Sequence, residues 1–142
     1  MSQKELRALE RRFFEEWNKA TAATAAAMGE LVATDLVLHG GDGSEIRGLD
    51  GYMKDHDDVF TAFPDARLTI DDLVIEGDKA AIRYTLTATH KGVFGGVKAS
   101  NRKVRGWGIQ IHRLAGGKIA EMWNRYDTLD LMKQLGAVTT SK

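Results

Sequence analysis

The sequence predicts a single α+β domain spanning all 142 residues, with three N-terminal helices on a curved, mainly antiparallel sheet and a short C-terminal helix. Up to Pro64 the apolar residues recur at helical spacing, whereas beyond it they alternate with a period of two. Glycine turns at Gly77 and at Gly116–Gly117 separate the alternating runs, which is typical of hairpins. Because three helices cannot fill a strongly curved sheet, we expect a conical pocket between the two layers.

Composition narrows the class of protein. Twenty basic and 20 acidic residues leave no net charge to attract nucleic acid or anionic lipid. The chain has no cysteine, which excludes disulfides, thiolate zinc sites and cysteine nucleophiles and suits a reducing cytoplasm. No signal peptide is visible in the charged start, and no apolar run approaches the roughly 20 residues of a membrane span. We therefore expect a cytoplasmic protein that binds neither nucleic acid nor membranes.

Local signals place the elements along the chain. Ser2 and Glu5 form the pattern of a capping box at the start of the first helix. Phe63 lies on the apolar stripe of the third helix, which Pro64 stops, and Gly136 ends the last helix. The expected helices cover residues 2–17, 28–32, 49–63 and 129–135, and the expected strands cover residues 35–39, 68–75, 80–90, 103–114 and 118–127.

The final strand carries an unusual set of side chains. A period of two places Ile119, Glu121, Trp123, Arg125 and Asp127 on one face. Charges are rarely buried without partners, so this face is either wet or lines a cavity in which the charges have a purpose. We favour the cavity, with the Glu121 and Arg125 side chains as a supporting ion-paired network. Alternatively, Arg125 keeps Asp127 ionised and orients it.

Two tryptophans are candidates for the pocket wall. The turn at Gly116–Gly117 pairs residues whose numbers sum to about 233, so that Trp107 and Trp123 are offset on neighbouring strands but can share a face. Two indoles in one cavity would suit a flat aromatic ligand, although both could instead fill the core. Ile109 shares the face of Trp107, and Tyr84, Tyr126 and Asn124 could donate hydrogen bonds to a ligand oxygen.

Several short motifs, in this order and spacing, resemble one protein family over nearly the whole chain. They are Ala62-Phe63-Pro64-Asp65, Glu76-Gly77-Asp78-Lys79, Thr89-His90-Lys91-Gly92, Arg113-Leu114-Ala115-Gly116-Gly117-Lys118-Ile119, Glu121-Met122-Trp123, Asp127 and Gln134-Leu135-Gly136. Together they resemble the SnoaL-like polyketide cyclases, the ester cyclase branch of the NTF2-like superfamily.

The resemblance implies both a fold and a chemistry. It implies a cone-shaped α+β barrel with a deep apolar pocket, assembled as a homodimer or homotetramer. Characterised cyclases of this kind close a polyketide ring by intramolecular aldol condensation, with no metal or cofactor. Their acid/base aspartate corresponds to Asp127, four residues after Trp123.

Asp127 also has a structural alternative. It stands just before the last helix, where aspartate is among the favoured N-cap residues. An aspartate at the apolar end of a pocket would be suited to remove a proton next to a carbonyl. Both roles remain open from the sequence.

The four histidines divide into different interpretations. His90, at a strand end, is either a turn histidine bonded to backbone or a partner that polarises a substrate carbonyl. His39, also at a strand end, is a structural residue or part of the substrate-binding wall, and His56 on an apolar stripe indicates a core histidine. His112 has the opposite parity to Trp107 and is expected to face outward. Their scattered spacing gives no indication of a metal site.

The leading hypothesis is a cofactor-independent enzyme of the cyclase type acting on a hydrophobic, carbonyl-bearing small molecule. Asp127 would remove an α-proton, and His90 or Tyr126 would stabilise the enolate. Isomerisation or dehydration would use the same groups, and epoxide hydrolysis would need a second carboxylate beside Arg125 and Asp127. A non-catalytic small-molecule carrier or dimerisation module is the alternative from a different class. The substrate-binding candidates are Trp107, Trp123, Tyr126, Asn124, Phe63, His39 and Ile109.

Overall fold

The computed structural model describes residues 1–41 and 43–138, and residues 42 and 139–142 lie outside the described part. The helices are α1 (Gln3–Lys19), α2 (Thr24–Leu31), α3 (Gly48–Ala62) and α4 (Thr128–Gln134). The strands are β1 (Val32–His39), β2 (Glu45–Arg47), β3 (Arg67–Glu76), β4 (Lys79–Thr89), β5 (Lys103–Ala115) and β6 (Lys118–Tyr126). Helices followed by hairpin-linked strands confirm the predicted α+β class.

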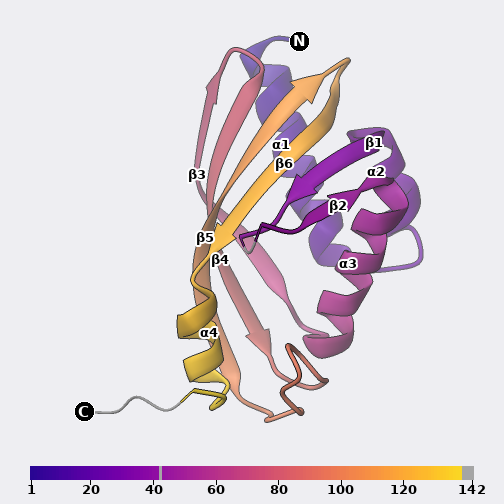
Figure 1. Ribbon diagram of the computed structural model, residues 1–142. Coiled ribbons are helices and arrows are strands. Elements are labelled where there is room, and N and C mark those ends of the chain that lie inside the picture. The colour runs from indigo at the N-terminus through magenta and orange to yellow at the C-terminus, as the bar shows by residue number, and fades with distance from the viewer. Residues whose placement is uncertain (42, 139–142) are drawn as a thin grey trace.

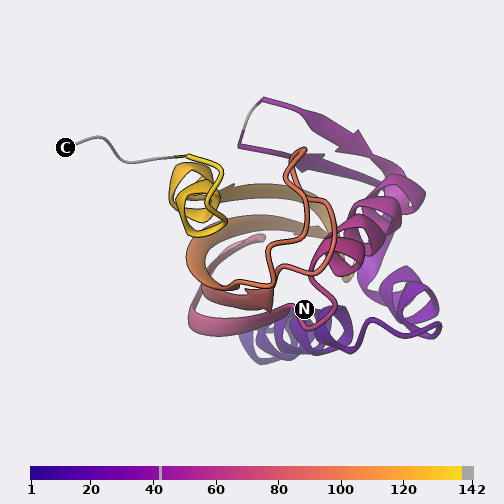
Figure 2. The same cartoon turned by 90° about the horizontal axis from the view of Figure 1, so that it is seen from below.

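The sheet has the strand order β2-β1-β6-β5-β4-β3. Strand β1 runs parallel to β6, and every other neighbouring pair is antiparallel. Strands β2 and β3 are the two edges, so the sheet formed by the described residues is not closed into a full barrel. It curls around α1 and α3, which lie across its concave side (Figures 1 and 2), with α1 against β3 and α3 against β1. Among the described helices, none combines the length and apolar character that a bilayer span requires.

Two local predictions are confirmed. The Ser2 side chain accepts a hydrogen bond from the Glu5 amide at 3.1 Å, and the Glu5 carboxylate accepts one from the Ser2 amide at 3.2 Å, which completes the capping box of α1. Gly116 and Gly117 have φ angles of 59° and 76°, the left-handed backbone that a two-residue hairpin turn requires. The β5–β6 hairpin therefore starts where the sequence places it.

A bulge at Ala120 changes which side chains of β6 face inward. Leu114 pairs with Ile119, but the next residue of β5, Arg113, pairs with Glu121, so Ala120 is an extra residue. Ile119 is buried, and beyond the bulge Met122 is the buried residue, at 1% exposure. The predicted single face from Ile119 to Asp127 is therefore wrong, because one added residue exchanges the two faces of the remaining strand.

In its middle part, β5 presents Gly106, Gly108, Gln110 and His112 to the concave face of the sheet and three large apolar residues to the convex face. Trp107, Ile109 and Ile111 are 57%, 41% and 39% exposed on the convex face. His112, on the concave face, is completely buried. The expectation that His112 faces outward is therefore wrong, because Glu10 of α1 supplies a buried partner for it.

Candidate active site

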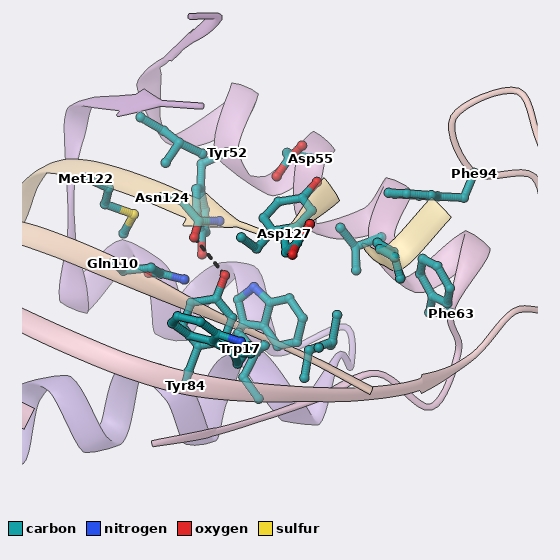
Figure 3. A pocket seen from close by; sticks show the side chains of 18 residues that line it. Trp17, Tyr52, Asp55, Phe63, Tyr84, Phe94, Gln110, Met122, Asn124 and Asp127 are labelled. Atoms are coloured by element: carbon teal, nitrogen blue, oxygen red, sulfur yellow. Dashed lines mark hydrogen bonds between the residues drawn. The ribbon is translucent and has the colours of Figure 1, made fainter. Parts of the chain in front are cut away.

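A pocket of about 190 Å³ opens between the concave face of the sheet and helices α1, α3 and α4 (Figure 3). This is smaller than the roughly 300–1,000 Å³ of typical ligand pockets, which favours a ligand of one or two rings. The apolar part of the wall consists of Trp17, Leu38, Val59, Phe63, Leu68, Leu86, Phe94, Met122 and Leu131.

Two glycines of β5 make room in the pocket. A Cβ atom on Gly108 would lie 2.5 Å from the Tyr84 hydroxyl and 2.6 Å from the Arg125 carbonyl oxygen, so only glycine lets the tyrosine occupy its place. A Cβ atom on Gly106 would meet nothing within 4 Å, and Gly106 itself lines the pocket. Gly108 therefore makes room for the Tyr84 side chain, and Gly106 leaves part of the cavity unfilled.

One end of the pocket is polar and buried. The Tyr84 hydroxyl donates to the Asn124 side-chain oxygen at 2.8 Å, and Gln110 is the neighbouring polar residue (Figure 3). Burial raises the pKa of Tyr84 to about 12, against the opposing effect of its hydrogen bond with Asn124. Burial also raises the pKa of Tyr52, which lines the same pocket from α3. Both tyrosines therefore stay protonated at neutral pH.

Two carboxylates from different elements line the pocket where it is accessible to solvent. Asp127 is exposed at the start of α4, and its Oδ1 atom accepts a hydrogen bond from the Asp130 amide at 2.9 Å. No hydrogen bond to its Oδ2 atom occurs within the described residues, so this oxygen can meet a ligand while the other caps the helix. Asp55 of α3 lines the same pocket. Asp55 is exposed, but partial desolvation raises the pKa of its carboxyl group, and the nearby Asp58 carboxylate adds to the rise.

The structure brings five of the residues predicted for the site to one pocket: Phe63, Trp107, Asn124, Tyr126 and Asp127. Trp107 reaches it from a largely exposed position on β5. Trp17 and His56 are buried, and the His56 Nε2 atom lies 3.0 Å from the Trp17 carbonyl oxygen, as expected of a core histidine. Trp17 nevertheless also forms part of the pocket wall.

His90 is placed behind the pocket wall. It is completely buried, and its Nδ1 atom lies 3.2 Å from the Ser100 amide nitrogen and 3.0 Å from the Ser100 hydroxyl. Its ring packs 5.5 Å from that of Phe63, which does line the pocket. A buried ring nitrogen that accepts from backbone matches the structural interpretation of His90, and its catalytic role stays a prediction.

The other predicted residues lie on or toward the convex face of the sheet. The His39 Nε2 atom contacts a Glu121 oxygen at 2.6 Å, and the His39 ring stacks on Trp123 at 5.2 Å. The Arg113 Nε atom donates to the other Glu121 oxygen at 3.1 Å, and the hydrogen bonds from His39 and then Arg113 lower the pKa of Glu121.

Ile109 and Arg125 pair across β5 and β6 on that same face, and the Arg125 guanidinium donates to the Gly40 carbonyl oxygen at 2.9 Å. The Ala120 bulge accounts for the placement of Trp123 and Arg125 here rather than in the cavity.

Besides apolar wall residues, the pocket contains three polar residues that the sequence did not indicate, namely Tyr52, Asp55 and Gln110. Tyr52, Asp55 and Val59 lie three and four residues apart, so they share one face of α3, and this spacing was the available signal. No cluster of three or more potential metal-ligating side chains occurs among the residues that the structure describes.

A half-open cone of this kind, with helices on the concave face and a pocket between the layers, defines an NTF2-like α+β domain. The model of the SnoaL-like polyketide cyclase family matches residues 8–135, and the chain belongs to this family. No protein of curated function matches the chain significantly.

Solved structures with the same fold span nearly the whole chain. A candidate SnoaL-like polyketide cyclase from Jannaschia sp. CCS1 superimposes with a TM-score of 0.89 at 21% identity, covering 98% of both chains. AclR, a candidate hydroxylase from Streptomyces galilaeus, has a TM-score of 0.85 at 26% identity, covering 99% of this chain and 91% of its own. IdmH, a candidate polyketide cyclase from Streptomyces antibioticus, has a TM-score of 0.79 at 27% identity, covering 92% and 97%.

Proposed function

We propose that this protein is a cofactor-independent enzyme that closes a ring by aldol-type acid/base chemistry on an apolar, carbonyl-bearing small molecule. The observation that carries the proposal is the placement of Asp127 and Asp55 in one largely apolar pocket that also contains a buried polar end. The family and the names of the similar structures support the same class of reaction. A cytoplasmic setting belongs to the proposal, since a chain without cysteine needs no oxidising compartment.

The two carboxylates have environments suited to different roles. Asp127 retains an oxygen beside its helix-capping bond and is the proposed base that takes a proton from the carbon next to a carbonyl. The resulting carbanion attacks the second carbonyl carbon of the same molecule, a carbon–carbon bond forms, and the new alkoxide takes a proton. Burial raises the pKa of Asp55, which favours its protonated form and suits it to supply that proton. Exchange with water at the pocket mouth restores both groups.

Exchange of carbon-bound hydrogen tests the first step without knowledge of the natural substrate. We expect the protein to accelerate deuterium incorporation at the α-carbons of 2-tetralone in D₂O, followed by NMR. The Asp127→Asn variant should lose about 10²- to 10⁴-fold of this rate. Its thermal stability should change little, since asparagine also caps helices well.

Asp130→Asn is the matched control, because Asp130 lies in the first turn of α4 but not in the pocket wall. It should exchange at the wild-type rate. If Asp127→Asn exchanges as fast as wild type, the base is not Asp127. If the wild-type protein binds 2-tetralone but does not accelerate the exchange above the rate in buffer alone, a non-catalytic carrier explains the data better.

Epoxide hydrolysis is not favoured by the site. The pocket offers the second carboxylate that this reaction needs, in Asp55, but the Arg125 guanidinium is bonded to Gly40 outside it. Isomerisation and dehydration use the same acid and base, so product analysis would separate them from ring closure.

Self-association forms a second part of the proposal. On the convex face, Val74, Ala81, Ile111 and Trp123 lie in register across four strands. Val74 is 61% exposed, and Trp107 and Ile109 extend the apolar area. Exposed apolar area of this kind, bordered by the Arg83–Asp72 ion pair, is typical of a protein interface. We propose a homodimer or homotetramer that covers this face.

A further inference from the structure

The segment between β4 and β5 contributes Phe94 to the pocket wall, and the proposed mechanism assigns this residue no role. In Figure 3, Phe94 lies beside Phe63 at one end of the pocket, and the centroids of the two rings are 5.1 Å apart. The polar side chains of Gln110, Tyr84 and Asn124 lie toward the other end (Figure 3). The pocket therefore has a polar end built by the sheet and an aromatic end that this segment completes.

The base of the segment is hydrogen-bonded to the end of α3. The amides of Lys91 and Gly92 both donate to the Ala62 carbonyl oxygen, at 2.8 Å and 3.0 Å. The base is also closed on itself, because the His90 amide donates to the Arg102 carbonyl oxygen at 2.9 Å. These bonds fix where the segment leaves the sheet and where it returns.

The tip of the segment is a small hairpin that carries Phe94. The Phe94 amide donates to the Val97 carbonyl oxygen at 3.0 Å, and the Val97 amide donates back at 2.8 Å. Between them, Gly95 and Gly96 have φ angles of 54° and 78°, as a two-residue hairpin turn requires. A Cβ atom on Gly95 would lie 3.5 Å from the Met132 Cε atom, so the tip packs against α4.

Figure 2 shows the segment lying across the open end of the curved sheet, between α3 and α4. Phe94 is thus supported from α3 through the base of the segment and from α4 through its tip. A ligand that reached beyond Phe94 would have to break these contacts.

We infer that Phe94 is a specificity-determining residue, which closes the aromatic end of the pocket and limits the ligand to carbonyl compounds of two fused rings. The cavity of about 190 Å³ lies below the roughly 300 Å³ at which typical ligand pockets begin. A bicyclic ketone with its oxygen at the polar end would place its far ring against Phe94 and Phe63. A third ring in line with the first two would collide with Phe94. The inference rests on the proposed function only in taking this pocket as the binding site.

Two matched ketones test the inference. 2-Tetralone has two fused rings, and 3,4-dihydroanthracen-2(1H)-one carries the same ketone with a third ring added in line. Their dissociation constants are measured by calorimetry in which the protein is titrated into each ligand. The ratio of the two constants contains the different hydration of the ligands, which is the same for every variant, so changes relative to wild type are compared.

The wild-type protein should bind the three-ring ketone no more tightly than 2-tetralone, despite its larger apolar area. Phe94→Ala removes the end wall and should shift the ratio at least tenfold in favour of the three-ring ketone. Tenfold is the lower limit of the discrimination that a single extra methylene meets in a closed apolar pocket. Phe94→Trp should act in the opposite direction, weakening 2-tetralone about tenfold relative to the single ring of cyclohexanone.

Val93→Ala is the matched control, because Val93 belongs to the same segment but is 64% exposed and lies outside the pocket wall. It should keep the wild-type ratio, and thermal melts establish that each variant is folded. If folded Phe94→Ala keeps the wild-type ratio, if Val93→Ala shifts it as far, or if the wild type binds neither ketone, the inference is overturned. Failure of the proposed function looks different, because α-proton exchange would then be absent while the dependence of ring number on Phe94 remains.

Discussion

The buried pair of Glu10 and His112 makes a specific prediction about folding stability. Both side chains have 0% exposure and their closest atoms are 2.8 Å apart, so neither has water to replace a lost partner. His112→Leu should therefore cost about 3–5 kcal/mol of unfolding free energy, because it leaves a buried carboxylate unpaired. For a domain of this size that lowers the Tm by roughly 6–20 °C. Glu10→Met should be destabilising for the same reason.

The double variant Glu10→Met/His112→Leu should be within about 2 kcal/mol of wild type, since packed apolar side chains replace both members of the pair. Urea unfolding followed by circular dichroism, at constant m-value, gives the four free energies of the cycle. The expected coupling between the two positions is about 3 kcal/mol or more. A loss below about 1 kcal/mol in His112→Leu, or additive losses in the double variant, would refute a dry, interacting pair.

Three further predictions follow from single residues. Gly108→Ala should lower the unfolding free energy in urea by about 1–3 kcal/mol, because the added Cβ atom displaces the Tyr84 hydroxyl. Gly106→Ala should cost less, because the Cβ atom enters open space, and equal losses in the two variants would contradict this explanation. Burial raises the pKa of Asp55, so the folded state holds that proton more tightly, and stability should fall as pH rises through the folded pKa, above 3.8. The Tm of Asp55→Asn should lack this decline with pH. If the curves of Tm against pH run parallel for the wild type and the variant, Asp55 does not cause the decline. If the proposed oligomer forms, Ile109→Glu should convert it to monomers in light scattering after gel filtration, and an unchanged mass would exclude an interface there.

The sequence predicted most elements, because their signals are local. It did not predict β2, and the expected helix over residues 28–32 is wrong at its end, because Val32 begins β1. The capping box of Ser2 and Glu5, the stop at Pro64 and the turn at Gly116–Gly117 each depend on neighbouring residues only. These signals, together with the change from helical to alternating spacing of the apolar residues after Pro64, are enough to predict the fold class. They also place Asp127 at the start of α4, where it both caps the helix and lines the pocket.

The faces of the last two strands could not be predicted in the same way. Ala120 has no property that marks a bulge, so an uninterrupted period of two assigned Trp123 to the cavity. On β5 the usual rule that apolar residues point inward fails, because Trp107 and Ile109 occupy the convex face. Partners distant in sequence cause this arrangement, as Glu10 does by burying His112.

The extra residue in β6 has a consequence for how this strand can change. With Ala120 present, every residue of β6 beyond it lies on the opposite face of the sheet from the one it would occupy without the bulge. Deletion of Ala120 would be expected to exchange both faces of the strand beyond it, which would send Trp123 and Arg125 toward the cavity and turn Asn124 and the core residue Met122 away from it. The extra residue at position 120 therefore determines which face of β6 borders the pocket.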